Sequence, residues 1–179
     1  MIFERIEDPG LSQYAYIVGC AGAGEIAVVD PRRDIDVFLD WAAAHGVRIA
    51  HVLETHIHAD FASGARELAE RTGAALHLSA YDEGEIFDVA FPHEPLHDGD
   101  TVQMGNVRLE AMHTPGHTPE HLAFLVYDLA RTAEAPMAML SGDFLFVGSV
   151  GRPDLLGEEA KAGLAAQQYE SVQRLRDLP

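Results

Sequence analysis

One short stretch of the sequence carries three side chains that can bind a metal ion. His56 and His58 are separated by one residue, and Asp60 follows two residues later. Neutral imidazole and carboxylate are ligands that borderline divalent metals prefer. The stretch follows the β-rich run 48–55, so we expect it in the loop after a strand, where side chains can converge on one point. A polar loop that merely contains histidines is the alternative for this stretch taken alone.

A second histidine-bearing turn follows the predicted strand 107–112. Residues 113–118 include a Pro-Gly pair, which favours a tight turn. A turn on a rigid strand end can fix one imidazole before a metal binds, and His117 is the natural candidate. We expect His113 and His121 to be turn residues or hydrogen-bond partners of ligands, because a ligating ring needs its other nitrogen bonded.

A third candidate ligand is Asp143, which closely follows the apolar run 137–140. A carboxylate at the end of a buried strand is costly unless its charge is compensated, and a metal ion compensates it. A turn or helix-capping role is the alternative. Three loops, each after a predicted strand, therefore each offer a ligand.

The other histidines and the single cysteine have no such context. We expect surface or core roles for the histidines, and Cys20 is expected to be a small apolar residue rather than a nucleophile. One cysteine also excludes an intrachain disulfide and a multi-cysteine zinc site. These histidines are His45, His51, His77, His93 and His97.

Length and charge narrow the class of protein. The 179 residues suffice for one domain with a real core. The formal charge of −17 repels phosphate backbones and anionic headgroups, so we expect no nucleic-acid partner. No apolar run approaches the roughly 18 residues of a membrane span, and the N-terminus lacks an export signal. We therefore expect no membrane association and a cytoplasmic location.

The elements that position these loops alternate along the chain. Apolar runs at 15–18 and 25–30 predict a hairpin, and a helix capped by Asp34 is expected to run through His45 to a left-handed Gly46. After strand 48–55, a helix beginning at Asp60 or Ser63 is expected to end at Gly73, before a strand at 76–79. The acidic segment 82–98 contains two prolines, which favour an irregular surface loop.

The second half has strand patterns followed by one helix. Short strands are expected at 101–104, 107–112, 122–127 and 137–140. The last helix, 158–178, is expected to bury Leu164, Tyr169, Val172 and Leu175. Two halves with β meanders and helices predict an α/β sandwich with the layers helix, sheet, sheet and helix.

With these motifs in order, the sequence resembles the metallo-β-lactamase superfamily. The motif His-x-His-x-Asp-His of that superfamily matches residues 56–61, except that residue 61 is Phe. In the two-metal hydrolases of the superfamily, this last His and the Asp before it help to build the second metal site. The resemblance therefore implies a four-layer αββα sandwich, and Phe61 disfavours a dinuclear centre.

Three stretches, 55–64, 114–118 and 142–155, are similar to the persulfide dioxygenases, especially the bacterial forms often fused to rhodanese domains. This similarity implies one non-haem Fe(II) per chain. It also implies that O2 oxidises glutathione persulfide, or a similar small persulfide, to sulfite and thiol. The implied iron ligands are His56, His117 and Asp143, with His58 and Asp60 close by.

The resemblance also implies a role for Arg152, which in the family lies near the substrate. Asp154 would orient it by hydrogen bonds. The alternative for this pair is a surface salt bridge of little energetic value. Some relatives carry Cys where this chain has Val150, and valine cannot replace a thiol.

The end of the chain differs from the usual superfamily pattern. Members normally continue with a further strand, a late His and a closing helix, so we expect a single domain over 1–179 that is truncated at its C-terminal end. An open sheet edge there would favour a homo-oligomer. The alternative is that the chain is a piece of a longer protein, with a fused or associated rhodanese domain.

Two other functions compete with the dioxygenase. A zinc-dependent thioester hydrolase of the glyoxalase II kind would use metal-bound hydroxide, and Phe61 argues against its second metal. A non-catalytic metal-binding module of a sulfurtransferase fusion is the third interpretation. Oxygen uptake separates the dioxygenase from both.

Overall fold

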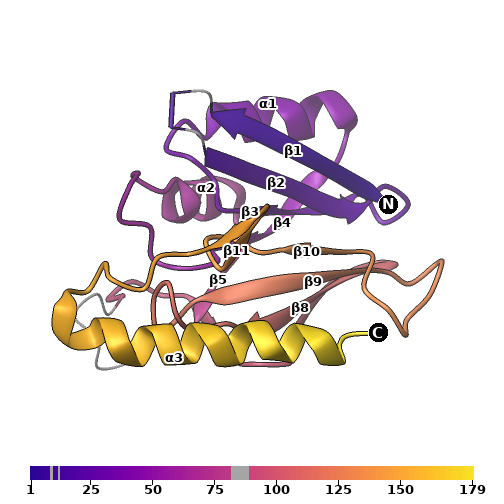
Figure 1. The fold of residues 1–179 in the computed structure, drawn as a ribbon. Coiled ribbons are helices and arrows are strands. Elements are labelled where there is room, and N and C mark those ends of the chain that lie inside the picture. The colour runs from indigo at the N-terminus through magenta and orange to yellow at the C-terminus, as the bar shows by residue number, and fades with distance from the viewer. Residues whose placement is uncertain (9, 12, 82–88) are drawn as a thin grey trace.

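Two β-sheets pack face to face, and helices cover the outer side of each sheet in the computed structural model (Figure 1). The structure describes residues 1–8, 10, 11, 13–81 and 89–179. Helices α1 (Asp36–His45) and α2 (Ala65–Thr72) cover the first sheet, and α3 (Glu158–Arg174) covers the second. This arrangement confirms the predicted αββα sandwich.

The first sheet has six strands in the order β1-β2-β3-β4-β5-β6. The first three strands pair antiparallel, and β3 to β6 pair parallel. The parallel strands place their carboxyl ends at one edge, and that edge positions the loop after β4. The strands are β1 (Ile2–Asp8), β2 (Gln13–Cys20), β3 (Glu25–Val29), β4 (Arg48–Leu53), β5 (Ala75–Ser79) and β6 (Glu94–Leu96).

The strand β6 corrects the expectation of an irregular loop over 82–98. Glu94–Leu96 pairs with β5, and its Pro95 is tolerated because β6 lies at the edge of the sheet, where one side needs no donor. Residues 82–88 of that segment lie outside the described part of the chain. The strand β1 was also not expected, since most of its residues are exposed and its apolar alternation is weak.

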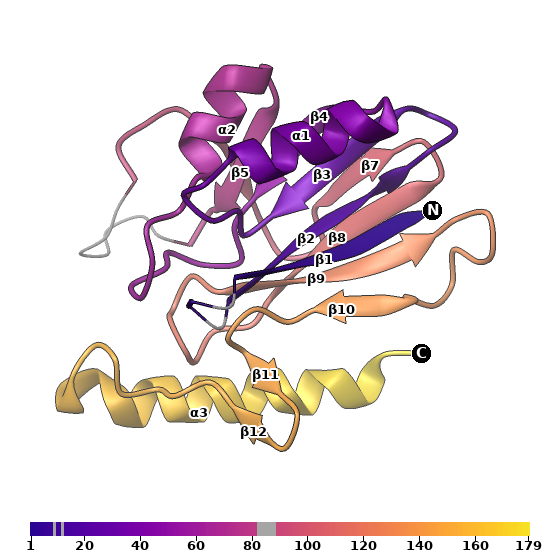
Figure 2. The same ribbon diagram turned by 90° about the horizontal axis from the view of Figure 1, so that it is seen from above.

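The second sheet has four antiparallel strands in the order β10-β9-β8-β7. A separate small hairpin, formed by β11 and β12, follows β10 (Figure 2). The strands are β7 (Thr101–Met104), β8 (Val107–His113), β9 (Leu122–Asp128), β10 (Ala138–Leu140), β11 (Leu145–Phe146) and β12 (Ser149–Val150). All four strands expected in the second half are therefore present in one sheet.

Apolar side chains fill the spaces between the layers. Phe38 and Leu68 lie in the cluster under α1 and α2, and Leu109 and Phe124 lie in the cluster between the sheets. All four side chains are almost completely buried. Burying one such side chain stabilises the fold by about 2 kcal/mol, so this packing holds the strand ends at the site in fixed positions.

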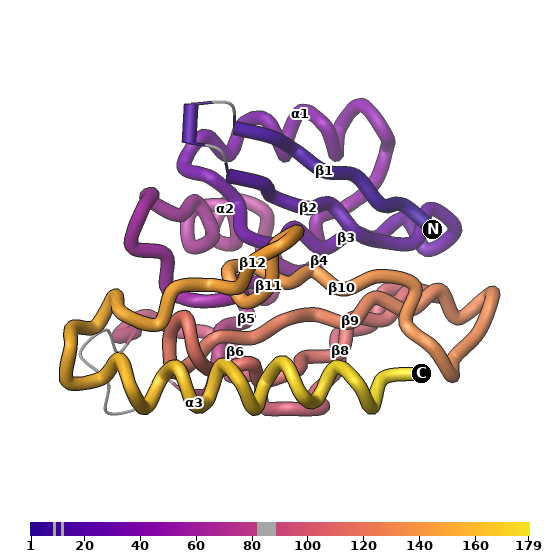
Figure 3. The backbone as a smooth tube through the Cα atoms, in the orientation of Figure 1, coloured from indigo at the N-terminus to yellow at the C-terminus, as the bar shows by residue number. Residues whose placement is uncertain are grey.

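The inward face of helix α3 partly matches the expectation: Leu164 is buried, and Leu175, just after the helix, packs against a buried apolar cluster. Leu164, Gln168 and Ser171 are buried, whereas Tyr169 is 66% exposed, so its predicted inward position is wrong. Hydrogen bonds explain why polar residues face inward. Gln168 donates to the Phe144 carbonyl at 2.7 Å, and Ser171 donates to the Pro115 carbonyl at 2.9 Å. Figure 3 shows the helix running along the second sheet, followed by the short 3-10 turn Leu175–Asp177.

The ends of the first two helices partly match the predictions. Gly46 and Gly73 adopt left-handed φ values of 64° and 70° and end their helices, as expected. Asp34 does not cap α1, which begins at Asp36, because its carboxylate faces Arg32 at 3.5 Å instead. Helix α2 begins at Ala65, whose N–H donates to the Ser63 hydroxyl at 2.9 Å.

Within the described residues, none of the helices is both long enough and apolar enough to cross a bilayer.

Candidate metal centre and its cleft

His56 lies in the loop that follows β4, and its ring orientation is fixed by Asp30. The Thr55 hydroxyl donates to the Asp30 carboxylate at 2.9 Å, so the Thr55 oxygen accepts from Nδ1 of His56 at 3.0 Å. This chain sets the tautomer with hydrogen on Nδ1 and leaves Nε2 with a lone pair. Burial holds the pKa of His56 well below its usual value. The ring is therefore neutral and able to ligate.

His117 lies at the end of the Pro-Gly turn after β8. Gly116 has a φ of 149°, and a Cβ there would lie 2.0 Å from the Gln168 side chain of α3. The turn is therefore pressed against α3, which positions the residue that follows. Burial lowers the pKa of His117, although Asp143 opposes this. Its Nε2 lies 3.4 Å from Oδ2 of Asp143.

Asp143 follows Gly142 in a tight turn after β10. Gly142 has a φ of 48°, and a Cβ there would lie 2.6 Å from the Thr55 hydroxyl and 2.7 Å from Nε2 of His121. The backbone N–H of Asp143 donates to Nε2 of His121 at 3.2 Å. The other ring nitrogen of His121 donates to the Thr114 hydroxyl at 2.8 Å. His121 thus connects the His117 turn to the Asp143 turn.

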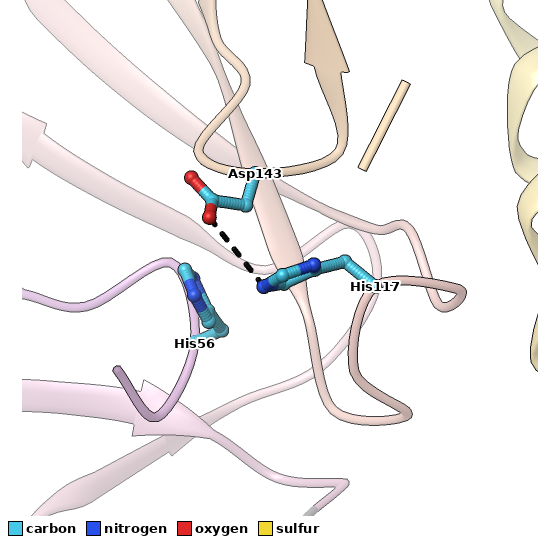
Figure 4. A group of neighbouring side chains, drawn as sticks. All are labelled: His56, His117 and Asp143. Carbon is cyan, nitrogen blue, oxygen red and sulfur yellow. Dashed lines mark ion pairs between the residues drawn. The ribbon is translucent and has the colours of Figure 1, made fainter. Parts of the chain in front are cut away.

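The structure brings His56, His117 and Asp143 together (Figure 4). One ligand atom from each residue lies within 4.8 Å of the other two, and the two histidines are buried. The rings of His56 and His117 meet edge to face with centroids 5.0 Å apart. Two neutral imidazoles and one carboxylate on one side of a cation form the donor set of a facial triad, with other positions open. The residues therefore fit one divalent metal ion.

His58 is turned away from this group toward two buried carboxylates. Its Nε2 lies 3.1 Å from Asp30 and 3.0 Å from Glu54, and Ser63 donates to Glu54. Burial opposes a charged ring, but Asp30 and Glu54 outweigh it and raise the pKa of His58 to about 11. Burial raises the pKa of Glu54 to about 7.

Asp30, Glu54 and His58 form a second group whose spacing would also suit a metal. In this group the imidazolium of His58 already bridges the two carboxylates and supplies a positive charge between them. We therefore interpret the group as a buried ion pair. Asp30 itself has a φ of 52°, a conformation that is costly for a residue other than glycine and often marks a functional site.

Phe61 lies against His58, with ring centroids 4.3 Å apart. The phenyl ring offers no ligand atom at this sixth motif position. Asp60 is exposed and lines a cleft together with Asp30, His58 and Asp143. This cleft has a volume of about 450 Å³, and Asp143 is the candidate ligand that lines it.

Arg152 and Asp154 lie outside the residues that line this cleft. The guanidinium donates to both carboxylate oxygens of Asp154, at 2.7 and 3.0 Å, so Asp154 does orient Arg152. The Arg152 side chain is 67% exposed. In this conformation the pair is a surface salt bridge, the alternative that its sequence pattern left open.

Sequence reasoning missed the two carboxylates that hold His58, and it missed Gln168. Asp30 showed one signal, an acidic residue before a proline at the end of an apolar strand. Glu54 showed a different signal: it is a carboxylate within a run predicted to be buried, two residues before the candidate ligand His56. His121 was expected as a hydrogen-bond partner of a ligand, and its bonds fit that role.

The comparisons with known proteins agree with this geometry. The sequence pattern of the metallo-β-lactamase superfamily matches residues 8–179. A hydroxyacylglutathione hydrolase from Methylococcus capsulatus is 37% identical over 181 residues, which cover 99% of this chain and 63% of that protein. A metallo-β-lactamase structure from Staphylococcus aureus has a TM-score of 0.93 and 39% identity, covering 100% of this chain and 53% of that one.

The structure of ETHE1 from Myxococcus xanthus has a TM-score of 0.79 and 28% identity, and the match covers 97% of this chain and 69% of that one. The chain thus spans from about half to about two thirds of the length of these three relatives. The match to the family pattern extends over nearly all of the sequence and includes every candidate ligand. The chain belongs to the metallo-β-lactamase superfamily.

Proposed function

We propose that this chain is a persulfide dioxygenase that uses a single Fe(II) held by His56, His117 and Asp143. The observation that carries the proposal is the position of His58, whose Nε2 lies between Asp30 and Glu54 instead of at the metal centre. With Phe61 in place of the sixth motif His, the second metal of a hydrolase lacks that nitrogen ligand, and His58 does not supply one.

The reaction would oxidise the outer sulfur of glutathione persulfide. One persulfide, one O2 and one water give one glutathione and one sulfurous acid, which ionises to sulfite; the four electrons lost by sulfur reduce O2. An iron ion held by His56, His117 and Asp143 would supply the electron transfer between sulfur and O2, because three protein ligands leave other positions open. The protein supplies the binding and orientation of the reactants.

Each residue then has a defined task. Thr55 keeps Nε2 of His56 free for the metal, and His121 holds the backbone of Asp143 in place. Asp60 lies on the wall of the cleft, where its carboxylate can accept the proton that the persulfide loses on binding. Arg152 would have to release Asp154 before it could reach a substrate.

A zinc-dependent thioester hydrolase is the second candidate, and one observation favours it. The relative from Methylococcus capsulatus, named a hydroxyacylglutathione hydrolase, is 37% identical over 99% of this chain. In this chain, however, the position after Asp60 is Phe61, whose ring packs on His58. A single metal could still activate water, so the hydrolase must be tested directly.

Oxygen uptake tests the proposal. Glutathione persulfide is added to anaerobically iron-loaded protein in aerated buffer, and O2 and sulfite are measured. We expect one O2 consumed and one sulfite formed per persulfide, and we expect His117→Ala to abolish both. The exposed His97→Ala variant is the matched control. Hydrolysis of a hydroxyacylglutathione thioester without O2 uptake would establish the hydrolase instead, and neither activity would indicate a binding module.

A further inference from the structure

Helix α3 presents a row of polar side chains to the turns that carry two of the candidate ligands. The row consists of Gln168, Ser171 and Arg174, and the first two are almost completely buried. Residues three apart are neighbours on a helix, so the row follows the axis of α3 along the second sheet (Figure 1). Each member of the row donates to a backbone carbonyl near a ligand turn.

Gln168 holds the turn of Asp143. Its Nε2 donates to the Phe144 carbonyl at 2.7 Å, and the same carbonyl accepts from the Gly151 N–H at 3.1 Å. Phe144 directly follows Asp143 in the chain. A Cβ on Gly151 would overlap the Asp143 carbonyl and would lie 3.0 Å from Cβ of His117. The two ligand turns therefore meet at Gly151, and Gln168 bonds this contact to α3.

Ser171 and Arg174 hold the turn of His117 at two points. The Ser171 hydroxyl donates to the carbonyl of Pro115, two residues before His117, at 2.9 Å. The Arg174 guanidinium donates to the carbonyl of His113, the last residue of β8, at 2.6 Å. Helix α3 therefore fixes both the start of this turn and its middle.

Asp98 completes the contact between Arg174 and His113. The guanidinium donates to both carboxylate oxygens of Asp98, at 2.9 and 3.0 Å, and Asp98 accepts from the His113 N–H at 2.7 Å. The carbonyl and the N–H of His113 are thus both bonded, one to the cation and one to its carboxylate. Both charged side chains are close to half exposed, so the pair adds little stability. Its bidentate geometry, however, defines the orientation of the strand end.

The burial of Gln168 is unfavourable for packing alone. Its Oε1 is buried and has no hydrogen-bond partner among the described residues. An unpaired buried acceptor lowers stability, and an apolar side chain of similar size avoids that cost. The hydrogen bond that the amide does make goes to the turn of a candidate ligand. Gln168 therefore contributes more to the geometry of the metal centre than to the stability of the fold.

We infer that α3 is a positioning element of the metal centre, and that its polar row sets the spacing between His117 and Asp143. The two ligands lie on separate turns, and α3 is bonded to both turns. Metal ligands must be held to within about 0.5 Å of their productive geometry, so these bonds raise metal affinity by fixing the turns in advance. The inference rests on the metal centre of the proposed function, but it holds for any divalent metal and any reaction there.

Binding of Co²⁺ tests the inference without turnover, because the visible absorption of Co²⁺ reports the geometry of its ligands. The metal-free protein is titrated with Co²⁺ against a competing chelator at low temperature. We expect the affinity of Gln168→Leu to be about fivefold lower than that of wild type, the equivalent of one net hydrogen bond, and its absorption bands to be shifted. The metal-free variant should resist urea at least as well as wild type, because the unpaired Oε1 is removed while the Phe144 carbonyl keeps the Gly151 N–H.

The matched control is Gln167→Leu, because Gln167 is the adjacent residue of α3 and is exposed. This variant should bind Co²⁺ with the affinity and the spectrum of wild type. At the other end of the row, Arg174→Gln should also lower the affinity, and Arg174→Lys should recover part of it, since lysine keeps a donor for the His113 carbonyl. Its control is Arg176→Gln, because Arg176 donates to Gln173 and not to a ligand turn.

The outcomes separate this inference from the proposed function. Lower affinity in Gln168→Leu and Arg174→Gln, with wild-type binding in both controls, supports the inference. Wild-type affinity and spectrum in Gln168→Leu or Arg174→Gln would overturn the part assigned to that residue, whatever the effect on stability. An equal loss in Gln167→Leu would overturn it too, because a general change in the helix would then be responsible. Absence of Co²⁺ binding by wild type would refute the metal centre itself, whereas O2 uptake decides the dioxygenase separately.

Discussion

Nε2 of His58 lies 3.1 Å from the carboxylate of Asp30, and both side chains are almost completely buried. The carboxylate of Glu54 lies at a similar distance on the other side, at 3.0 Å. A histidine that a metal-binding motif offers as a ligand is therefore used to neutralise buried carboxylates. This use of His58 leads to the first prediction.

Replacing His58 should destabilise the fold without removing the metal. In His58→Ala, Asp30 and Glu54 lose their counter-charge, and breaking a buried ion pair in this way costs on the order of 3 kcal/mol. The three candidate ligands remain, so we expect about one metal ion per chain at low temperature. Urea unfolding and metal analysis of the same preparation measure both effects. The exposed His97→Ala should change neither, and loss of metal at unchanged stability would show that His58 is a ligand.

Acid should weaken the fold through the histidine pair of β4 and β5. Nδ1 of His51 lies 3.0 Å from Nε2 of His77, and this contact requires at least one neutral ring. Burial, reinforced by His51, lowers the pKa of His77 to about 4. An unfolded histidine has a pKa near 6.5, so the unfolded state binds the extra proton between these values. The free energy of unfolding is therefore highest above pH 6.5 and falls as the pH is lowered toward 4.

The expected size of this loss is about 2 kcal/mol between pH 7 and pH 5. Urea unfolding at the two pH values measures it in wild type and in His77→Gln, which cannot titrate. The variant should lose less stability than wild type by about that amount, and His93→Gln should behave as wild type. An identical pH dependence in wild type and His77→Gln would contradict the assignment.

Gly142→Ala should impair metal binding. Its Cβ would approach the Thr55 hydroxyl and Nε2 of His121 to within 2.6 and 2.7 Å, so the backbone that carries Asp143 must shift. We expect metal affinity to fall at least tenfold. Gly24→Ala is the control, because its φ of 69° is equally unfavourable for alanine but no atom lies within 4 Å. If both variants bind metal like wild type, the turn does not position Asp143.

Removing the ring of His121 should loosen the same ligand from the other side. His121→Ala deletes the acceptor of the Asp143 backbone N–H and the donor to Thr114. Hydrogen-bond partners of metal ligands typically contribute 10- to 100-fold in affinity, and we expect a loss of about that size. A competitive chelator titration measures it. His121→Asn, which keeps an acceptor, should recover part of the affinity, whereas equal losses in both variants would argue for a packing role only.

Local pattern was enough to locate eight of the strands, though not β1, β6, β11 or β12, and to single out the three candidate ligands. His56, His117 and Asp143 each come after an apolar β-rich run, and the ends of packed strands bring such loops to one place. The left-handed Gly46 and Gly73 could be predicted for a similar reason, because the cap depends on a few neighbouring residues. Features set by short-range chemistry were therefore accessible from the sequence.

Features that depend on distant partners were not accessible. The role of Asp30 follows from a residue 28 positions away, and the burial of Gln168 follows from a carbonyl 24 positions away. Tyr169 has the right spacing for an inward face, but α3 turns Gln168 and Ser171 inward to satisfy the carbonyls of the ligand loops. The strand β6 forms because β5 offers a free edge, which overrides the local effect of Pro95.

The metal content of the purified protein tests the central claim most directly. Iron and zinc should be quantified together against protein concentration, after anaerobic and aerobic purification, in wild type and His117→Ala. The account predicts about one iron per chain in the anaerobic wild type and almost none in the variant. Two metal ions per chain, or a full complement of iron in His117→Ala, would contradict a single Fe(II) held by His56, His117 and Asp143.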